Sequence, residues 1–352
     1  MLRILVLGAA AGGGFPQWNC NCAACRRARA GDPDAIPSHQ ASVAVSGDGE
    51  HWFVLNAAPE LRQQINENPA LHPKHGLRGS PVAGVVVTNG DIDAVAGLLD
   101  LREGTPFSVY GHERVLRVLR ANSVFNVLDA NLVPRRDLPL DRTIPLLLAD
   151  GTPSGLTVET FAVPGKVALY LEDLSKGAAA GYGSEPGDTV GLHIREEKGG
   201  GEMFFISSCA HMTPEIAGRL KGAPLVFFDG TVWTDDEMIK AGMGTKTGSR
   251  MGHMYMSGPD GTIAAFRDLD VKRKVFVHVN NSNPALLGDS PERAELEAAG
   301  WEVGYAGMEL TVPDNGVTQV QARGANAEAR GAHAVAKGGH ATARISIKVG
   351  RS

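Results

Sequence analysis

Short apolar runs alternate with amphipathic stretches along most of the chain. Residues 1–8 and 82–87 are rich in Leu, Ile and Val, have the length of buried strands, and run into glycine or polar residues. A helix is predicted at 94–101, and a further strand and helix follow at 107–111 and 113–119. This alternation predicts a layered α/β protein.

The second half of the sequence repeats this organisation. Further strands are predicted at 156–163, 187–194, 203–208, 225–231 and 274–281, and an earlier hairpin at 38–56. The last two strands are strongly apolar and end in polar residues. Because polar groups at strand ends gather at one edge of such folds, we expect a functional site there.

Composition narrows the class of protein. The chain has 352 residues, 43% hydrophobic and 21% charged, which is enough to bury a large core. Its formal net charge is −5 and it has no dense basic face, so nucleic acid is not expected as a partner. No apolar run has the length of a membrane span and no signal-peptide pattern opens the chain, so we expect no membrane partner and a cytoplasmic location.

The last part of the sequence differs from the rest. From residue 314 onward it is rich in Ala, Gly and Lys, lacks apolar periodicity and offers little bulk for packing. We therefore expect one folded domain over 1–313 and a disordered extension over 314–352.

Three cysteines, Cys20, Cys22 and Cys25, lie within six residues of sequence. Thiolates at these spacings can surround one tetrahedral zinc, and without a secretory signal this is favoured over disulfides, with redox-active thiols as the alternative. Three thiolates leave a structural Zn²⁺ one ligand short. Cys209 follows a strand-like run and is expected to be a buried apolar residue.

Two aspartates follow the strand predicted at 82–87. On extended backbone Asp91 and Asp93 point to the same side, so their carboxylates can converge on one cation. Asp93 also precedes an apolar run, as a helix N-cap does. These residues alone leave a metal site and a helix cap as open alternatives.

Several long strings resemble a known family. Residues 12–22 (GGGFPQWNCNC), 229–233 (DGTVW), 251–254 (MGHM) and 278–284 (HVNNSNP) are similar to those of the pyrroloquinoline quinone (PQQ) biosynthesis protein B family, in the metallo-β-lactamase superfamily. The resemblance covers about residues 1–313. It implies an αββα sandwich of two mixed sheets flanked by helices, with a metal site at one edge between the sheets.

The resemblance also implies how this site departs from the hydrolases of the superfamily. Those enzymes carry His-x-His-x-Asp-His and bind two metals that activate water. Here these places are taken by Asn89, Asp91, Asp93 and Ala94. A later hydrolase histidine would fall near Gly165 or Lys166, and the bridging aspartate near Ser208, so a two-zinc hydrolase is disfavoured.

His278 matches a metal ligand of the hydrolases and is retained. With Asp91 and Asp93 it forms the expected active-site set, to which His253 can add a second imidazole. Fe(II) oxygenases use two histidines and one carboxylate and leave positions open for O₂ and substrate. The resemblance therefore implies an active-site Fe²⁺ that hydroxylates a small, acidic, tyrosine-derived intermediate of PQQ synthesis.

Further residues have secondary roles in this expectation. Asp229 is expected to orient His278, although it can also be a ligand or a turn residue. Lys166 and Arg102 can pair with substrate carboxylates. Asn281 matches the place where a related phosphodiesterase family has the fourth ligand of its cysteine-bound zinc, although Asn is a poor zinc ligand.

Two other functions stay open at this stage. The chain could carry PQQ or its precursor without turnover, or it could be a metal-dependent hydrolase. In each case the expected partners are a small acidic molecule and other proteins of the PQQ pathway, with a homodimer as one oligomeric state.

Overall fold

The computed structural model describes residues 1–176, 184–313 and 318–320, and these residues form two mixed β-sheets. The first sheet contains, in spatial order, β15 (Thr318–Val320), β14 (Glu309–Val312), β1 (Leu2–Gly8), β2 (Ser42–Ser46), β3 (Trp52–Leu55), β4 (Val82–Val86), β5 (Ser108–Gly111) and β6 (Arg135–Asp137). The second contains β13 (Trp301–Val303), β12 (Lys274–Val277), β11 (Val226–Asp229), β10 (Glu202–Ile206), β9 (Val190–Glu196), β8 (Pro153–Ala162) and β7 (Thr143–Leu147).

Each sheet joins an antiparallel part to a parallel part. Strands β3 to β6 are parallel in the first sheet, and strands β10 to β13 are parallel in the second. Parallel strands need long crossover connections, and these connections carry most of the helices. Ligands in such folds bind beyond the carboxyl ends of parallel strands. The parallel parts of both sheets therefore predict a site at this edge.

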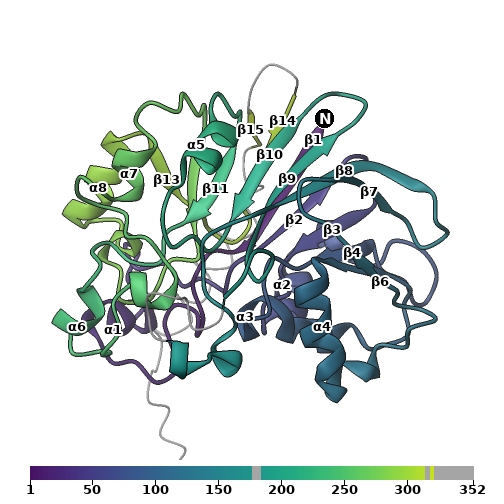
Figure 1. Ribbon diagram of the computed structural model, residues 1–352, viewed down its shortest axis with the longest axis horizontal. Helices are drawn as coiled ribbons and strands as arrows, with labels where there is room; N and C mark the ends of the chain where they lie inside the picture. Colours follow the sequence, from purple (N-terminus) through teal and green to yellow (C-terminus); the bar gives the residue numbers. More distant parts are fainter. Residues whose placement is uncertain (177–183, 314–317, 321–352) are drawn as a thin grey trace, which may run out of the picture. The chain divides into compact units, whose positions relative to one another are not determined.

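Helices cover the outer faces of the two sheets (Figure 1). The α-helices are α1 (Ala23–Arg29), α2 (Leu61–Glu67), α3 (Ile92–Val95), α4 (Glu113–Ala121), α5 (Pro214–Leu220), α6 (Glu237–Lys240), α7 (Thr262–Ala265) and α8 (Pro291–Ala298). Short 3₁₀ turns occupy Pro69–Leu71, Ala96–Leu101, Ser123–Val127, Leu169–Leu171, Leu174–Lys176, Ser249–Met251 and Pro284–Leu286. No helix in the described part of the chain is long and apolar enough to cross a membrane.

The apolar core lies in three layers, as the alternation of side chains along each strand requires. Val86 and Phe227 point inward and pack between the sheets. Their neighbours Val85 and Val87 pack outward beneath α3 and α4, and Phe228 packs outward beneath α5 and α8. The αββα sandwich expected from the sequence is therefore the observed fold.

Two details differ from the sequence expectation. The helix predicted at 94–101 begins at Ile92, and after Val95 it continues as a 3₁₀ turn over Ala96–Leu101. Residues 318–320, inside the extension expected to be disordered, form β15 and pair with β14. The rest of that extension, 314–317 and 321–352, lies outside the described residues.

Candidate metal centre

The predicted site residues follow the carboxyl ends of four parallel strands. Asp91 and Asp93 follow β4, Ser208 follows β10, Asp229 ends β11 and His278 follows β12. Beneath them Asn56 links the two sheets: its Oδ1 accepts the Thr88 N–H at 2.9 Å, and its Nδ2 donates to Ser207 Oγ at 3.2 Å. Asn56 has a φ of 60°, a left-handed conformation that Asn tolerates better than most residues.

Helix capping does not account for either aspartate. The N-cap of α3 is Asp91, but its side chain makes no capping hydrogen bond, and Asp93 lies within the first turn. The backbone N–H of Asp91 is instead bound by Asn89 Oδ1 at 2.9 Å. Both carboxylates are therefore available for contacts outside the helix.

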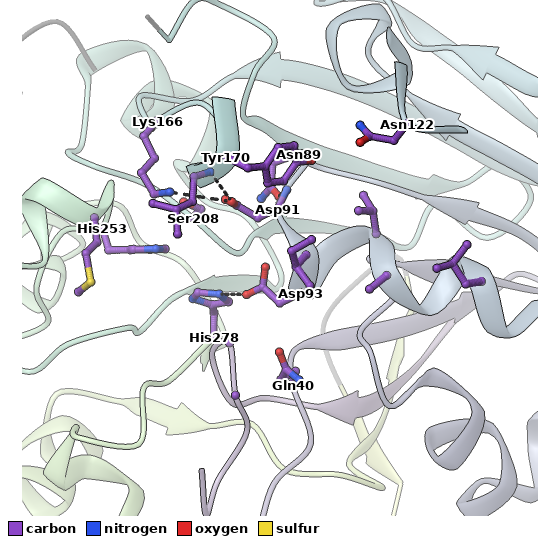
Figure 2. Close-up of a pocket in the computed structure, with 18 of the residues that line it drawn as sticks. Gln40, Asn89, Asp91, Asp93, Asn122, Lys166, Tyr170, Ser208, His253 and His278 are labelled. Atoms are coloured by element: carbon purple, nitrogen blue, oxygen red, sulfur yellow. Dashed lines mark hydrogen bonds and ion pairs between the residues drawn. The ribbon is translucent and has the colours of Figure 1, made fainter. Parts of the chain in front are cut away.

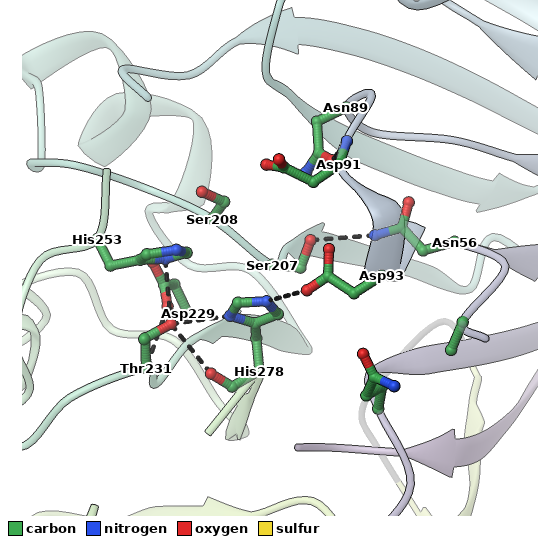
Figure 3. Close-up of polar contacts among 12 residues, drawn as sticks. Asn56, Asn89, Asp91, Asp93, Ser207, Ser208, Asp229, Thr231, His253 and His278 are labelled. Atoms are coloured by element: carbon green, nitrogen blue, oxygen red, sulfur yellow. Dashed lines mark hydrogen bonds and ion pairs between the residues drawn. The ribbon is translucent and has the colours of Figure 1, made fainter. Parts of the chain in front are cut away.

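Asp93 and His278 are in direct contact across the two sheets. Asp93 Oδ2 lies 2.9 Å from His278 Nε2 (Figure 3). Burial by itself would lower the pKa of His278, but the hydrogen bond and charge of Asp93 outweigh it and raise that pKa. Burial likewise opposes the ionised form of Asp93, yet His278 lowers the pKa of that carboxyl.

His253 and His278 stack against each other, with ring centroids 5.0 Å apart and an interplanar angle of 20°. Their Nδ1 atoms lie 3.0 and 2.8 Å from the hydroxyl of Thr231. His253 Nδ1 also lies 2.7 Å from Asp229 Oδ2. The Nδ1 side of both rings is thus engaged, which leaves the Nε2 side to face Asp93 and the cavity.

Asp229 is the fully buried base of this network. Its Oδ1 accepts the N–H of Thr231 at 3.0 Å and the Thr231 hydroxyl lies 2.7 Å away, while its Oδ2 accepts the Cys209 N–H at 2.9 Å. Ligand atoms of Asp229, His253 and His278 lie within 4.8 Å of one another. Both Asp229 oxygens are thus bound within the protein, and Asp229 contacts His253 directly and His278 through the Thr231 hydroxyl.

The donor set fits a metal ion on the Nε2 side. With Nδ1 of His278 donating to Thr231, its Nε2 presents a lone pair to the Asp93 carboxylate, and two acceptors at 2.9 Å require a cation or proton between them. Two ligands each about 2.1 Å from a metal and about 90° apart lie about 3 Å from each other. The observed separation fits two cis ligands of a metal, and with a proton on Nε2 it equally fits the hydrogen bond between His278 and Asp93.

The Asp91 side chain makes its hydrogen bond and its ion pair away from Asp93 and the two histidines. Its Oδ1 accepts the Leu169 N–H at 3.1 Å and lies 3.9 Å from Lys166 Nζ. Burial raises the pKa of Asp91, and Lys166 partly offsets this. The structure thus joins Asp93 to His278, groups His278 with His253 and Asp229, and turns Asp91 toward the segment that begins at Lys166.

A cavity of about 890 Å³ opens beside these groups (Figure 2). Its polar side includes Asp93, His253, His278, Ser208, Lys166 and Lys246, and its apolar side includes Ile92, Val95, Leu99, Val124, Phe125 and Leu169. Lys166, one of the two cations expected to pair with substrate carboxylates, lines the cavity, and its substrate contact stays a prediction. Arg102, the other cationic candidate, is exposed, binds Leu99 O and does not line the cavity.

The three clustered cysteines form a second donor group. The sulfur atoms of Cys20, Cys22 and Cys25 lie within 4.8 Å of one another. Asn281, which is 4% exposed, donates from Nδ2 to Cys25 Sγ at 3.4 Å, and its backbone oxygen lies 4.0 Å from Cys22 Sγ. Met243 Sδ lies 4.0 Å from Cys20 Sγ. Three close sulfurs fit a thiophilic ion such as Zn²⁺.

Some residues of the site were not expected from the sequence. Thr231, Asn56, Lys246 and the apolar wall at Val124 and Phe125 carry no local pattern that sets them apart. For Thr231 the one available signal was its place in the string DGTVW beside Asp229.

The fold and the site define a protein of the metallo-β-lactamase class, and comparison with known proteins agrees. The model of the β-lactamase superfamily domain matches residues 51–279. A diphosphatase of the PhnP family shares the fold at a TM-score of 0.60 and 19% identity, covering 88% of this chain and 98% of that one.

More specifically, the chain belongs to the coenzyme PQQ synthesis protein B family. It is 58% identical to that protein of Gluconacetobacter diazotrophicus over 311 residues, which cover 88% of this chain and all of the relative. A Rhodopseudomonas palustris relative is 55% identical over 313 residues, covering 89% of this chain and all of that protein. The crystal structure of Zn²⁺-bound PqqB from Methylobacterium extorquens is 48% identical, with a TM-score of 0.82 over 88% of this chain and 100% of that one.

Proposed function

We propose that this protein acts in PQQ biosynthesis as a metal-dependent oxygenase that hydroxylates a small, acidic, tyrosine-derived intermediate. Its family supports the pathway, since its relatives are coenzyme PQQ synthesis proteins. The observation that carries the chemistry is that His278, which stacks on His253, contacts the Asp93 carboxylate at the edge of the cavity. This is the ligand composition of non-haem Fe(II) oxygenases, which leave positions open for O₂ and substrate.

In this proposal Asp93, His253 and His278 hold Fe²⁺. When bound, the metal supplies binding and reduction of O₂ next to the substrate. The protein's own groups do the rest: Thr231 and Asp229 fix the imidazoles in the tautomer that turns Nε2 to the metal, and Lys166 and Lys246 pair with substrate carboxylates.

Asp91 has a different role in this proposal from the one expected by sequence. The sequence expectation placed it on the metal with Asp93 and His278, and that set stays a prediction. Its contacts with Leu169 and Lys166 support a role in holding the 166–172 segment against the cavity. We therefore assign Asp91 to substrate enclosure and charge balance.

Hydrolysis by two metals is the less favoured function. Ser208 lies beside the cavity where the bridging aspartate of the hydrolases is expected, and a hydroxyl is a poor bridge between cations. Lys166 Nζ, 15% exposed, stands near Asp91 and supplies a positive charge on this side of the cavity. A second metal ion at this place would be repelled by the positive charge of Lys166 and would gain no ligand from it.

The cysteine cluster is assigned a structural Zn²⁺. Its relative from Methylobacterium extorquens binds Zn²⁺, and three thiolates suit that ion better than Fe²⁺ bound by carboxylate and imidazole. Clustered cysteines that form no disulfide are typical of reducing compartments, so we place the protein in the cytoplasm. Other pathway proteins would supply the substrate and take the product.

The test is anaerobic loading with Fe²⁺, followed by O₂, ascorbate and an acidic tyrosine derivative, with mass spectrometry as the readout. Isotopically labelled O₂ should add one labelled oxygen atom to the substrate, and Asp93→Asn, as the matched variant, should add none. The carrier function is the alternative favoured by the largely apolar cavity. Tight, stoichiometric binding without product in the loaded wild type would support the carrier and overturn the oxygenase.

A further inference from the structure

We infer that the cysteine cluster anchors the metal ligand His278, and that Asn281 transmits this anchoring. The inference rests on the proposed active-site metal. In this inference the cluster does more than stabilise its own loop. It also keeps His278 in the position from which it binds the active-site metal.

The two donor groups share a four-residue segment. His278 leaves the end of β12 toward Asp93, and three residues later Asn281 is buried against two sulfurs of the cluster. Between them, Val279 forms a parallel bridge with Ala10: its N–H donates to Ala9 O, and its carbonyl accepts the Ala11 N–H, each at 2.9 Å. The segment therefore has little freedom to shift as long as its far end is held.

The backbone of His278 has an uncommon conformation that its surroundings hold in place. Its φ is 57°, in the left-handed region that only a small share of non-glycine residues adopt, His more often than most. Residues in this region persist only where their surroundings over-determine them, and they cluster at functional sites. The Thr231 hydroxyl lies 3.0 Å from the His278 carbonyl, and two residues after His278 the Asn280 N–H donates to Thr231 O at 3.0 Å. Downstream, the hold is Asn281 on the cysteines.

The loop that carries the cysteines also reaches the other ligand, Asp93. It begins at Ala9 and Ala11, which pair with Val279, and it passes Gly12, which lines the cavity. A methyl group added at Gly12 would lie 3.4 Å from Asp93 Oδ2, so the loop backbone passes close to that carboxylate. One loop thus borders both members of the Asp93–His278 pair.

A metal on the cluster would stiffen this arrangement. It fixes three sulfurs as thiolates, and an N–H bond to a charged acceptor is shorter and stronger than one to a neutral thiol. With the metal removed, Asn281 loses a fixed partner and His278 can relax from the left-handed conformation. Affinity at the active site should then fall, even though none of its own ligands has changed.

The test titrates Mn²⁺ by electron paramagnetic resonance, because Mn²⁺ prefers oxygen and nitrogen ligands and reports on the active site alone. Asn281→Ala should weaken Mn²⁺ binding about tenfold or more, the loss seen when groups that orient metal ligands are removed. The matched control is Asn280→Ala, since the Asn280 side chain contacts Met238 and Ser282 and not the cysteines. It should leave Mn²⁺ affinity within about twofold of wild type.

A second arm avoids mutation. A chelator that strips zinc from the wild type should weaken Mn²⁺ binding to the same extent, and refilling with Cd²⁺, which prefers thiolates, should restore it. Unchanged Mn²⁺ affinity in both Asn281→Ala and the stripped protein overturns the anchoring role and leaves the proposed function standing. A wild type that binds no Mn²⁺ overturns the active-site metal, and this inference with it.

Discussion

The imidazole of His278 and the carboxylate of Asp93, 185 residues apart in sequence, lie 2.9 Å apart at the junction of the two sheets. Each side chain comes from the carboxyl end of a parallel strand, one in each sheet. The contact therefore exists only when the whole sandwich is assembled. It couples the metal chemistry proposed for this edge to the fold itself.

The first prediction separates the two aspartates of the loop. Asp93→Asn should lower active-site metal affinity about 100-fold, because it removes a charged ligand and leaves His278 with a neutral partner. Asp91→Asn should change that affinity less than about tenfold, because its carboxylate contacts Leu169 and Lys166. Metal titration of both variants checks this. Equal losses in the two variants would return Asp91 to the ligand set.

The second prediction concerns Thr231, whose hydroxyl contacts both imidazoles and Asp229. Thr231→Val keeps the shape of the side chain but removes its hydrogen bonds, so active-site metal affinity should fall about 10- to 100-fold. Thr234→Val, on the same loop, removes only a contact to Asp236 and should have little effect. If the two variants titrate alike, the Thr231 hydroxyl does not orient the ligands.

The third prediction is a pH dependence at Glu172. The hydrogen bond from Arg250 lowers the pKa of this carboxyl, and Lys166 adds to the effect although burial opposes it. A depressed folded-state pKa stabilises the protein above the unfolded pKa of about 4.3, and the gain is lost as pH falls through the folded value. Glu172→Gln should thus cost about 1–2 kcal/mol of unfolding free energy at pH 7.

Urea unfolding at several pH values checks this third prediction. The difference between wild type and Glu172→Gln should be constant between pH 6 and 8, and should shrink below about pH 4. Glu103→Gln is the control, because the Glu103 side chain is 66% exposed in its ion pair with Arg102. It should change stability by less than about 0.5 kcal/mol at every pH. A difference for Glu172→Gln that persists undiminished at low pH would exclude an ionic origin.

Much of the fold and part of the site could be predicted from sequence, for different reasons. Apolar runs such as 82–87 and the start of 274–281 predict buried strands. Their alternation with amphipathic stretches predicts the α/β layers. Asp93 was a candidate from the spacing of the two aspartates, and the resemblance added His278, which no local pattern links to it. The Asp91–Asp93 ligand pair stays a prediction: its spacing argument assumes extended backbone, and in the structure α3 begins at Ile92, between the two residues.

Other features could not be predicted because they depend on tertiary contacts. Thr231 matters through two histidines that lie 22 and 47 residues away in sequence. The 3₁₀ turn at Ala96–Leu101 follows an apolar pattern that fits an α-helix equally well. The need for glycine at position 97 becomes visible only in the structure. A methyl group added there would lie 2.1 Å from Ala58 O.

The last prediction assigns different metals to the two donor groups. Cys22→Ala should lose the zinc of the cluster and lower the thermal midpoint, because a structural zinc contributes folding free energy directly. Asp93→Asn should keep that zinc, because no Asp93 atom belongs to the cysteine group. Cys209→Ala is the matched cysteine control: burial raises the pKa of Cys209 well above its usual value, so it stays a neutral, apolar thiol and its loss should leave the zinc content unchanged. Metal analysis of the three variants beside wild type checks this prediction. Loss of zinc in Asp93→Asn, or retention of zinc in Cys22→Ala, would show that the two groups do not form separate sites.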